Sequence, residues 1–206
     1  MATPRARELA RRWLAACACA LLAGTATATE PCGRFPSPGL EGLQRVKGRY
    51  SNAQYFYSVD VPAELAAYTE PAPQPDHGFG IVLSWEPRAY LDVDAMYDTL
   101  EWKTAAVAAN QSLAWTRESS TQVLSHARAP ARLGALRALR QVVRHRCAGL
   151  GDVYVDDDVI AVDAKEGVVY KVALTTTQAR YRQDKAVMDR VLATWRQGQS
   201  ISPRGR

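Results

Sequence analysis

Six arginines lie between residues 119 and 151, a stretch without any acidic residue: Arg128, Arg132, Arg137, Arg140, Arg144 and Arg146. Residues 29–118 carry seven basic and twelve acidic side chains, so an acidic first part precedes a basic block. The planar guanidinium fork binds carboxylate and phosphate groups. The block therefore predicts a surface for an anionic partner, either a protein, a lipid or a polysaccharide. The alternative is that these arginines pair with the acidic first part of the same domain.

Histidine is the second source of chemistry, and the chain has three: His77, His126 and His145. None belongs to a pair spaced by four residues, so the sequence predicts no metal site. His77 stands between Asp76 and Gly78, where a Pro-rich loop enters an expected strand. It is a candidate binding residue, and a small hydrolase with its site near His77 is the alternative function. The simpler interpretation is a hydrogen bond from His77 that holds the loop.

Five aspartates between residues 152 and 163 resemble a calcium site in composition: Asp152, Asp156, Asp157, Asp158 and Asp163. Their spacing lacks the alternating ligands, central glycine and terminal glutamate of a calcium loop. We therefore expect them at solvated strand ends and turns. The chain also lacks a Gly-x-Ser-x-Gly elbow and a glycine-rich phosphate loop with a lysine, so no cofactor is predicted.

The first 28 residues have the pattern of a secretory leader. Four arginines precede an apolar stretch at residues 13–24, and Ala26-Thr27-Ala28 supplies the small residues of a cleavage site. Cleavage would leave a chain that begins at Thr29 and lies in the periplasm or outside the cell. Residues 14–17 also resemble a lipobox, which would instead place a lipid on Cys17. Twelve apolar residues are too few for a membrane span, which needs about 20.

Loss of the leader changes both the charge and the cysteine content. The net charge falls from +5 to +2, with 22 basic and 20 acidic residues left, so the high pI is no argument for nucleic-acid binding. Cys32 and Cys147 remain as the thiols of an exported protein, and an oxidising compartment favours a disulfide between them. An intermolecular bridge through Cys32 or two free thiols are the alternatives.

The positioning elements follow from hydrophobic periodicity. A period of two predicts strands at residues 55–61, 79–85, 121–125 and 137–147, and a hairpin with strands at 159–162 and 168–174. On the strand at 137–147, Arg140, Arg144 and Arg146 share one face, with Arg137 on the opposite face. Helical spacing predicts one helix at about residues 95–111, capped by Asp94, and a second that Asp184 caps and Gly198 ends. The fold class is α+β, a mainly antiparallel sheet with a mid-chain helix and a C-terminal helix packed on it.

Three segments carry a resemblance to a known group. Residues 55–65, the hairpin around Val169-Tyr170 and the final Ala193-Thr194-Trp195-Arg196 resemble the PsbP and DcrB type of small exported α/β domain. A His-Gly pair after a Pro-rich loop, as at His77-Gly78, is similar to uncharacterised bacterial envelope proteins. The resemblance implies a largely non-enzymatic accessory or binding protein, and a likeness of fold does not by itself determine function.

These observations predict a single α+β domain at residues 50–197, preceded by an N-terminal segment at 29–49 and followed by a flexible tail at 198–206. The expected protein is an exported, non-enzymatic binding or accessory protein of the bacterial envelope. Its predicted site residues are His77, Arg137, Arg140, Arg144 and Arg146. No transmembrane segment is expected once the leader is removed.

Overall fold

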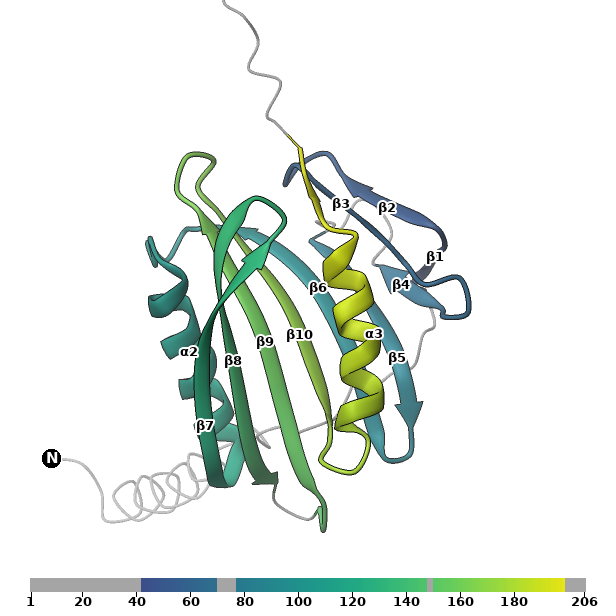
Figure 1. Cartoon of the computed structure of the whole chain (residues 1–206), viewed down its shortest axis with the longest axis vertical. Helices are drawn as coiled ribbons and strands as arrows, with labels where there is room; N and C mark the ends of the chain where they lie inside the picture. Colours follow the sequence, from purple (N-terminus) through teal and green to yellow (C-terminus); the bar gives the residue numbers. More distant parts are fainter. Residues whose placement is uncertain (1–41, 70–76, 148–149, 199–206) are drawn as a thin grey trace, which may run out of the picture. The chain divides into compact units, whose positions relative to one another are not determined.

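Two antiparallel sheets and two helices make up the computed structural model, which describes residues 42–69, 77–147 and 150–198. The eight-stranded sheet has the spatial order β1 (Gln44–Val46), β4 (Ala67–Thr69), β5 (Gly78–Trp85), β6 (Arg88–Tyr97), β10 (Val168–Thr177), β9 (Val153–Asp163), β8 (Leu136–Cys147), β7 (Ser120–Leu133). The smaller sheet has the order β11 (Arg196–Gln197), β3 (Tyr57–Asp60), β2 (Arg49–Asn52). With α2 (Ala105–Ser119) in mid-chain and α3 (Tyr181–Ala193) near the C-terminus, the predicted α+β class is confirmed (Figure 1).

The larger sheet is covered on both faces, because side chains alternate along each strand. On one face, Tyr170, Val172 and Leu174 of β10 belong to the main core with Met188 and Val191 of α3. On the other face, Val169 and Ile160 form a second cluster with Ala108 and Ala109 of α2. Figure 1 shows α3 in front of the sheet and α2 behind β7 and β8. Along β9, odd-numbered residues such as Val159 therefore face α3, and even-numbered residues such as Ile160 face α2.

The smaller sheet joins the main core through aromatic rings. Trp195 stacks on Tyr57 with ring centroids 4.6 Å apart and an interplanar angle of 2°. The same indole meets Tyr170 edge-on at 5.6 Å. It also approaches the turn between β7 and β8, where Gly134 has φ +57° and a Cβ would lie 2.9 Å from Cδ1 of Trp195. The turn therefore requires glycine for two reasons, its positive φ and this close approach.

The mid-chain helix lies further along the chain than the sequence indicated. The expected helix at residues 95–111, with Asp94 as its cap, is wrong at its beginning, because β6 continues to Tyr97 and pairs with β10 up to Val168. Leu91, Val93 and Ala95 are buried on one face of β6, so the period of two persists there. The helix begins at Ala105 after a turn, and Thr104 caps it by accepting a hydrogen bond from the Val107 amide at 3.3 Å.

The C-terminal helix has the expected apolar stripe but not the expected cap. Met188 and Val191 are buried, and Trp195 follows them just beyond the end of the helix at Ala193. The N-cap position belongs to Arg180, which makes no capping hydrogen bond with its side chain. Asp184 lies inside the helix and is nearly fully buried. It accepts hydrogen bonds from the Arg180 guanidinium at 3.0 and 3.1 Å and from Thr176, so it ties α3 to β10.

The predicted strand at 55–61 is shorter than expected, since only Tyr57–Asp60 forms β3 and residues 53–56 are a turn. Other predicted strands are present with longer bounds. The segment at 121–125 is part of β7, the 137–147 segment is β8, and the predicted hairpin is β9 and β10. Neither described helix has the length and hydrophobicity that a membrane crossing requires. The leader, Cys32, the Pro-rich loop at 71–75 and the tail after Gly198 lie outside the described residues.

Candidate functional site

The β7–β8 hairpin carries the basic block, and its two faces differ. The ladder pairs Arg140 with Val159, Arg144 with Val155 and Arg146 with Val153, so these three arginines share the face toward α3. Arg137 has the opposite parity, on the face toward α2, and its partner across the hairpin is Arg132. The structure thus places the four predicted arginines on the faces that the strand pattern indicated, but it does not bring them together with His77.

Arg140 is the most engaged of these arginines. Its Nε and Nη2 donate to the two carboxylate oxygens of Asp157 at 2.7 and 2.6 Å, and its Nη1 lies 3.3 Å from Asp189 of α3. The Asp157 side chain is 0% exposed, and it also accepts a hydrogen bond from the Tyr181 hydroxyl at 2.7 Å. The hydrogen bonds that Arg140 donates to Asp157 raise the pKa of this arginine well above its usual range. This arginine therefore holds α3 against the sheet.

Arg144 is also directed into the domain. Its Nε donates to Oε1 of Gln178 at 2.7 Å, and its guanidinium lies 5.9 Å from the centroid of the Tyr181 ring. The counter-groups of Arg140 and Arg144 thus come from β9, α3 and the segment between β10 and α3. Arg140 and Arg144 therefore do not pair with the acidic first part of the chain, which was the alternative interpretation of the basic block.

On the face toward α2 the arginines meet no acid. Arg128 donates through Nε and Nη2 to the Gln141 side-chain oxygen at 2.8 and 2.7 Å, and through Nη1 to Asn110 of α2 at 2.8 Å. Arg132 donates to the carbonyl of Ala135 at 3.4 Å, and both Arg132 and Arg137 are exposed. Within the described ranges, no carboxylate lies within 4.0 Å of the guanidinium of Arg128, Arg132 or Arg137.

Three of the five aspartates, Asp156, Asp157 and Asp158, lie in the middle of β9 and are wholly or partly buried, so their expected location at solvated strand ends and turns is wrong. The other two lie where they were expected, Asp152 exposed before β9 and Asp163 at its end, where it accepts hydrogen bonds from the turn amides of Lys165 and Glu166. Asp157 faces α3, whereas Asp156 and Asp158 face α2. Asp158 accepts a hydrogen bond from Ser112 of α2 at 2.6 Å and lies 3.5 Å from Nζ of Lys171. Although burial lowers the pKa of Lys171, the carboxylates of Asp158, Asp156 and Asp92 raise it more. These aspartates are structural partners of α2 and β10.

Asp92 on β6 belongs to the same polar cluster, with a side chain that is partly exposed beside α2. Burial raises the pKa of Asp92 to about 7, and the nearby Lys171 opposes that rise. In the described part of the chain, no group of three histidine, cysteine or acidic side chains has the geometry to hold a metal ion.

A serine, a histidine and an aspartate meet where β7 begins, which the sequence analysis missed. Oγ of Ser120 lies 2.8 Å from Nδ1 of His145, and Nε2 of His145 lies 3.0 Å from Oδ2 of Asp156. Although burial raises the pKa of Asp156, the adjacent His145 imidazole lowers it more. Ser120 and His145 are 25 positions apart in the chain, and His145 and Asp156 are 11 apart. The β7–β8 pairing, which includes two register shifts, and the β8–β9 pairing bring them together.

The order of the contacts is that of a serine–histidine–aspartate relay, but its surroundings differ from those of a catalytic site. His145 is 1% exposed, so a substrate has no direct access to its ring. Thr116 of α2 and Thr175 of β10 also donate to Asp156, at 3.1 and 3.0 Å. These contacts therefore connect α2 to four strands, β7, β8, β9 and β10, which is a packing role.

His77 precedes β5 and is half exposed, with Nδ1 3.9 Å from Oδ1 of Asp94. Its backbone carbonyl accepts hydrogen bonds from the Ala95 amide at 2.9 Å and the Tyr57 hydroxyl at 3.0 Å. Its ring lies 5.5 Å from the ring of Tyr55. The backbone of His77 thus anchors β5, while its ring is accessible beside a carboxylate.

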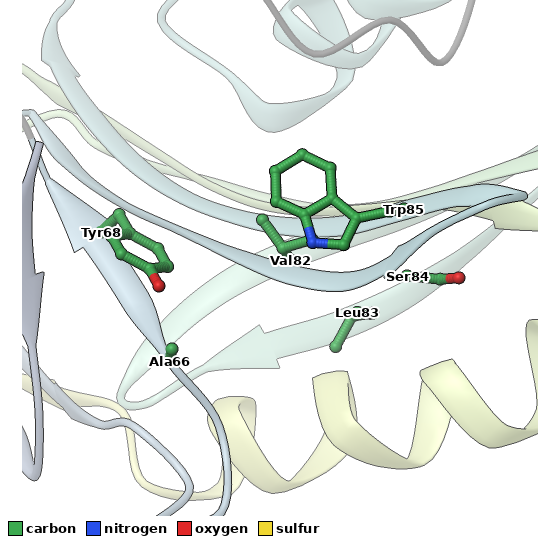
Figure 2. Close-up of a pocket in the computed structure, with 6 residues that line it drawn as sticks. All are labelled: Ala66, Tyr68, Val82, Leu83, Ser84 and Trp85. Carbon is green, nitrogen blue, oxygen red and sulfur yellow. The ribbon is translucent and has the colours of Figure 1, made fainter. Parts of the chain in front are cut away.

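A small pocket of about 190 Å³ lies elsewhere, beside β4 and β5. Figure 2 shows its lining, which consists of Ala66, Tyr68, Val82, Leu83, Ser84 and Trp85. None of the predicted site residues lines it. Its lining contains no acidic or basic side chain, so the pocket does not collect the acid, base and nucleophile that a hydrolase needs.

No family model matches the chain, and no curated protein matches it. Similar solved structures include cyanobacterial PsbP (CyanoP) from Synechocystis sp. PCC 6803, with 15% identity, a TM-score of 0.46, and coverage of 81% of this chain and 98% of that one. LpqN, a Mycobacterium tuberculosis protein involved in cell envelope biogenesis, has 10% identity, a TM-score of 0.47, and coverage of 76% and 92%.

A protein from Bacteroides thetaiotaomicron VPI-5482 gives 10% identity and a TM-score of 0.47, covering 74% of this chain and 49% of that one. The chain therefore spans about half the length of the Bacteroides protein. A PsbP structure, from the group that the sequence resembles, is thus among the similar solved structures.

Proposed function

We propose that this chain is an exported, non-enzymatic binding or accessory protein of the bacterial envelope, and that it binds an anionic partner through the β7–β8 hairpin. The observation that carries the proposal is the difference between the two faces of that hairpin. Arg140 bonds to buried Asp157, whereas Arg132 and Arg137 are exposed without a carboxylate within 4.0 Å among the described residues. The exposed Arg132 and Arg137 are therefore available for a partner, whereas Arg140 and Arg144, on the face toward α3, serve the fold.

Export is the second part of the proposal. It depends on the leader at residues 1–28, cleavage before Thr29, and a disulfide between Cys32 and Cys147. Cys147 ends β8 and is only 3% exposed, beside Tyr154. A bridge at a buried position of this kind would be protected from exchange with external thiols, which supports a structural role.

A small hydrolase with its site near His77 is the second candidate. The half-exposed His77 ring 3.9 Å from Asp94 supports it, since a carboxylate orients the imidazole in acid/base catalysis. The accessible geometry contains an imidazole with a carboxylate nearby. The buried His145 relay is a separate cluster on β8 and β9.

The test is expression of the whole chain in a bacterial host, followed by fractionation and mass spectrometry. We expect the envelope or secreted fraction to contain a protein that begins at Thr29 and has no alkylatable thiol before reduction. We also expect this protein to bind anionic material and to hydrolyse none of a panel of ester, amide and phosphoester substrates. An uncleaved cytoplasmic chain would contradict export. Turnover that is lost in His77→Ala, with folding retained, would replace the binding function by the hydrolase.

A further inference from the structure

Two arginines stand directly opposite one another at the outer end of the β7–β8 hairpin. The register pairs Arg132 with Arg137, so both side chains lie on the same face of the ladder. Directly opposed residues in an antiparallel pair have Cβ atoms about 4.5–5.5 Å apart, and like charges at such positions are destabilising. An exposed hairpin that places two fixed positive charges together gains stability from any anion that bridges them.

The described residues supply no such anion. The carbonyl of Ala135, within the turn itself, accepts from Arg132 at 3.4 Å and carries no formal charge. Further along the same face, Arg128 donates to the neutral side chains of Gln141 and Asn110. The positive charge thus continues over four strand residues, about 13 Å, without an acidic partner in the described part of the chain.

The backbone that carries the pair is firmly held. Leu133, next to Arg132, is 0% exposed and belongs to the main core. Gly134 turns the chain against the Trp195 indole, and Leu136 packs against the same core on the returning strand. These contacts fix the backbone at the two arginines before a ligand arrives, so little ordering of the backbone is required on binding.

We propose that Arg132 and Arg137 form a binding site for one phosphate group. The inference rests on the proposed binding function and names the ligand chemistry of that hairpin. A phosphate monoester carries a charge of about −1.5 to −2 at pH 7 and three terminal oxygens. One such group balances both guanidinium charges and accepts hydrogen bonds from both forks. A single carboxylate carries only one negative charge and leaves one arginine unbalanced.

The phosphate can come from solution or from a lipid headgroup, and both sources present the same chemistry. The two are distinguished by titrating inorganic phosphate and, separately, vesicles of phosphatidylcholine with and without phosphatidic acid. Binding to both identifies the phosphate group itself as the ligand. Binding to the vesicles alone identifies a phosphate displayed on a membrane surface.

The decisive variant is Arg132→Gln with Arg137→Gln. Arg45→Gln with Arg182→Gln is the matched control, because it removes the same charge from two exposed positions on β1 and α3. We expect the first variant to weaken phosphate binding at least about tenfold, and the control to weaken it less than about twofold. Equal weakening in both variants would show a diffuse charge effect and overturn the site.

Stability without ligand provides an independent readout. Removal of opposed like charges should leave the phosphate-free Arg132→Gln/Arg137→Gln variant at least as stable as the unsubstituted protein. The melting temperature of the unsubstituted protein should rise with phosphate beyond its rise in sodium chloride of equal ionic strength, and that excess should vanish in the variant. A phosphate-free variant that melts lower would show a structural role for the pair and overturn the proposal.

The outcomes separate this site from the broader function. If the unsubstituted protein binds acidic peptides or polyglutamate but not phosphate, the phosphate site is wrong and the binding function stands. If phosphatidic acid vesicles bind equally to the protein and to the Arg132→Gln/Arg137→Gln variant, the anionic site lies elsewhere. If the protein binds no anionic probe at all, both proposals fail.

Discussion

Replacement of Arg140 by methionine tests whether this arginine holds the fold or awaits a partner. The change removes two hydrogen bonds to Asp157 and the ion pair to Asp189, while the methionine keeps most of the apolar stem. The Asp157 side chain is 0% exposed, and among the described residues it would keep only the Tyr181 hydroxyl as a side-chain partner. Loss of one partner from a buried ion pair costs about 3–5 kcal/mol, because the remaining charge is uncompensated.

The matched control is Arg49→Met. Arg49 makes a similar two-bond contact with Asp60, at 2.8 and 3.2 Å, but the two side chains are 48% and 41% exposed. Water solvates the remaining carboxylate there, so this variant should lose little or no stability. Urea unfolding followed by tryptophan fluorescence measures both variants. For a domain of this size, the Arg140→Met loss corresponds to a fall in melting temperature of about 6–20 °C.

A double variant separates loss of a favourable contact from the penalty of a buried charge. Arg140→Met with Asp157→Leu replaces both charges by apolar groups, and such replacement of a whole buried pair is often neutral in stability. We therefore expect the double variant to recover most of the single variant's loss. If Arg140→Met costs no more than Arg49→Met, or if the double variant is as unstable as the single one, the structural assignment of Arg140 is refuted.

Three further substitutions test the polar cluster and the turn. Burial raises the pKa of Asp92 to about 7, so the native state is favoured while Asp92 is protonated and loses stability as the pH rises through that value. Asp92→Asn should therefore stabilise the protein by about 1–2 kcal/mol at pH 8, a figure reduced for partial exposure, and have no effect at pH 4. Asp60→Asn, at a carboxyl whose pKa the Arg49 hydrogen bond lowers, should give no such gain in the same denaturation series. His145→Ala removes the buried ring between two polar groups and should cost about 2–3 kcal/mol in urea unfolding, so a loss below about 1 kcal/mol would contradict the packing role. Gly134→Ala should lower the melting temperature more than Gly42→Ala, because both have positive φ but a Cβ meets other atoms within 4 Å only at Gly134.

The sequence predicted the strands best where one face of each is buried over many residues. In β10, Val168, Tyr170, Val172 and Leu174 are all 0% exposed, so the period of two is complete and local. The helix at 95–111 was misplaced because Met96, Leu100 and Val107 also fit a helical spacing. Pairing of β6 with β10, at positions more than 70 residues away, determines the structure up to Tyr97. Such long-range pairing has no local signal.

The candidate site illustrates the same limit in its electrostatics. The alternation of arginines between the two faces of β8 followed from strand geometry alone. The acid that neutralises Arg140 comes from the next strand, and Asp189 comes from a helix 49 residues further on. The three consecutive aspartates of β9 looked like a solvated turn, because the arginine, lysine, histidine, serine and threonine that surround them belong to other elements.

The basic block therefore divides into arginines with different roles, although the sequence presents them as one feature. Arg140 has a buried counter-charge and contributes to cohesion between β8, β9 and α3. Arg132 and Arg137 repel one another on an exposed hairpin whose turn is fixed by the core. Attraction of a polyanion depends on charge that the fold leaves uncompensated, not on the number of arginines in a segment. Substitution of Arg132 and Arg137 should for this reason lower the affinity for an anionic ligand. Substitution of Arg140 should lower the stability of the fold, and it should affect binding only through unfolding.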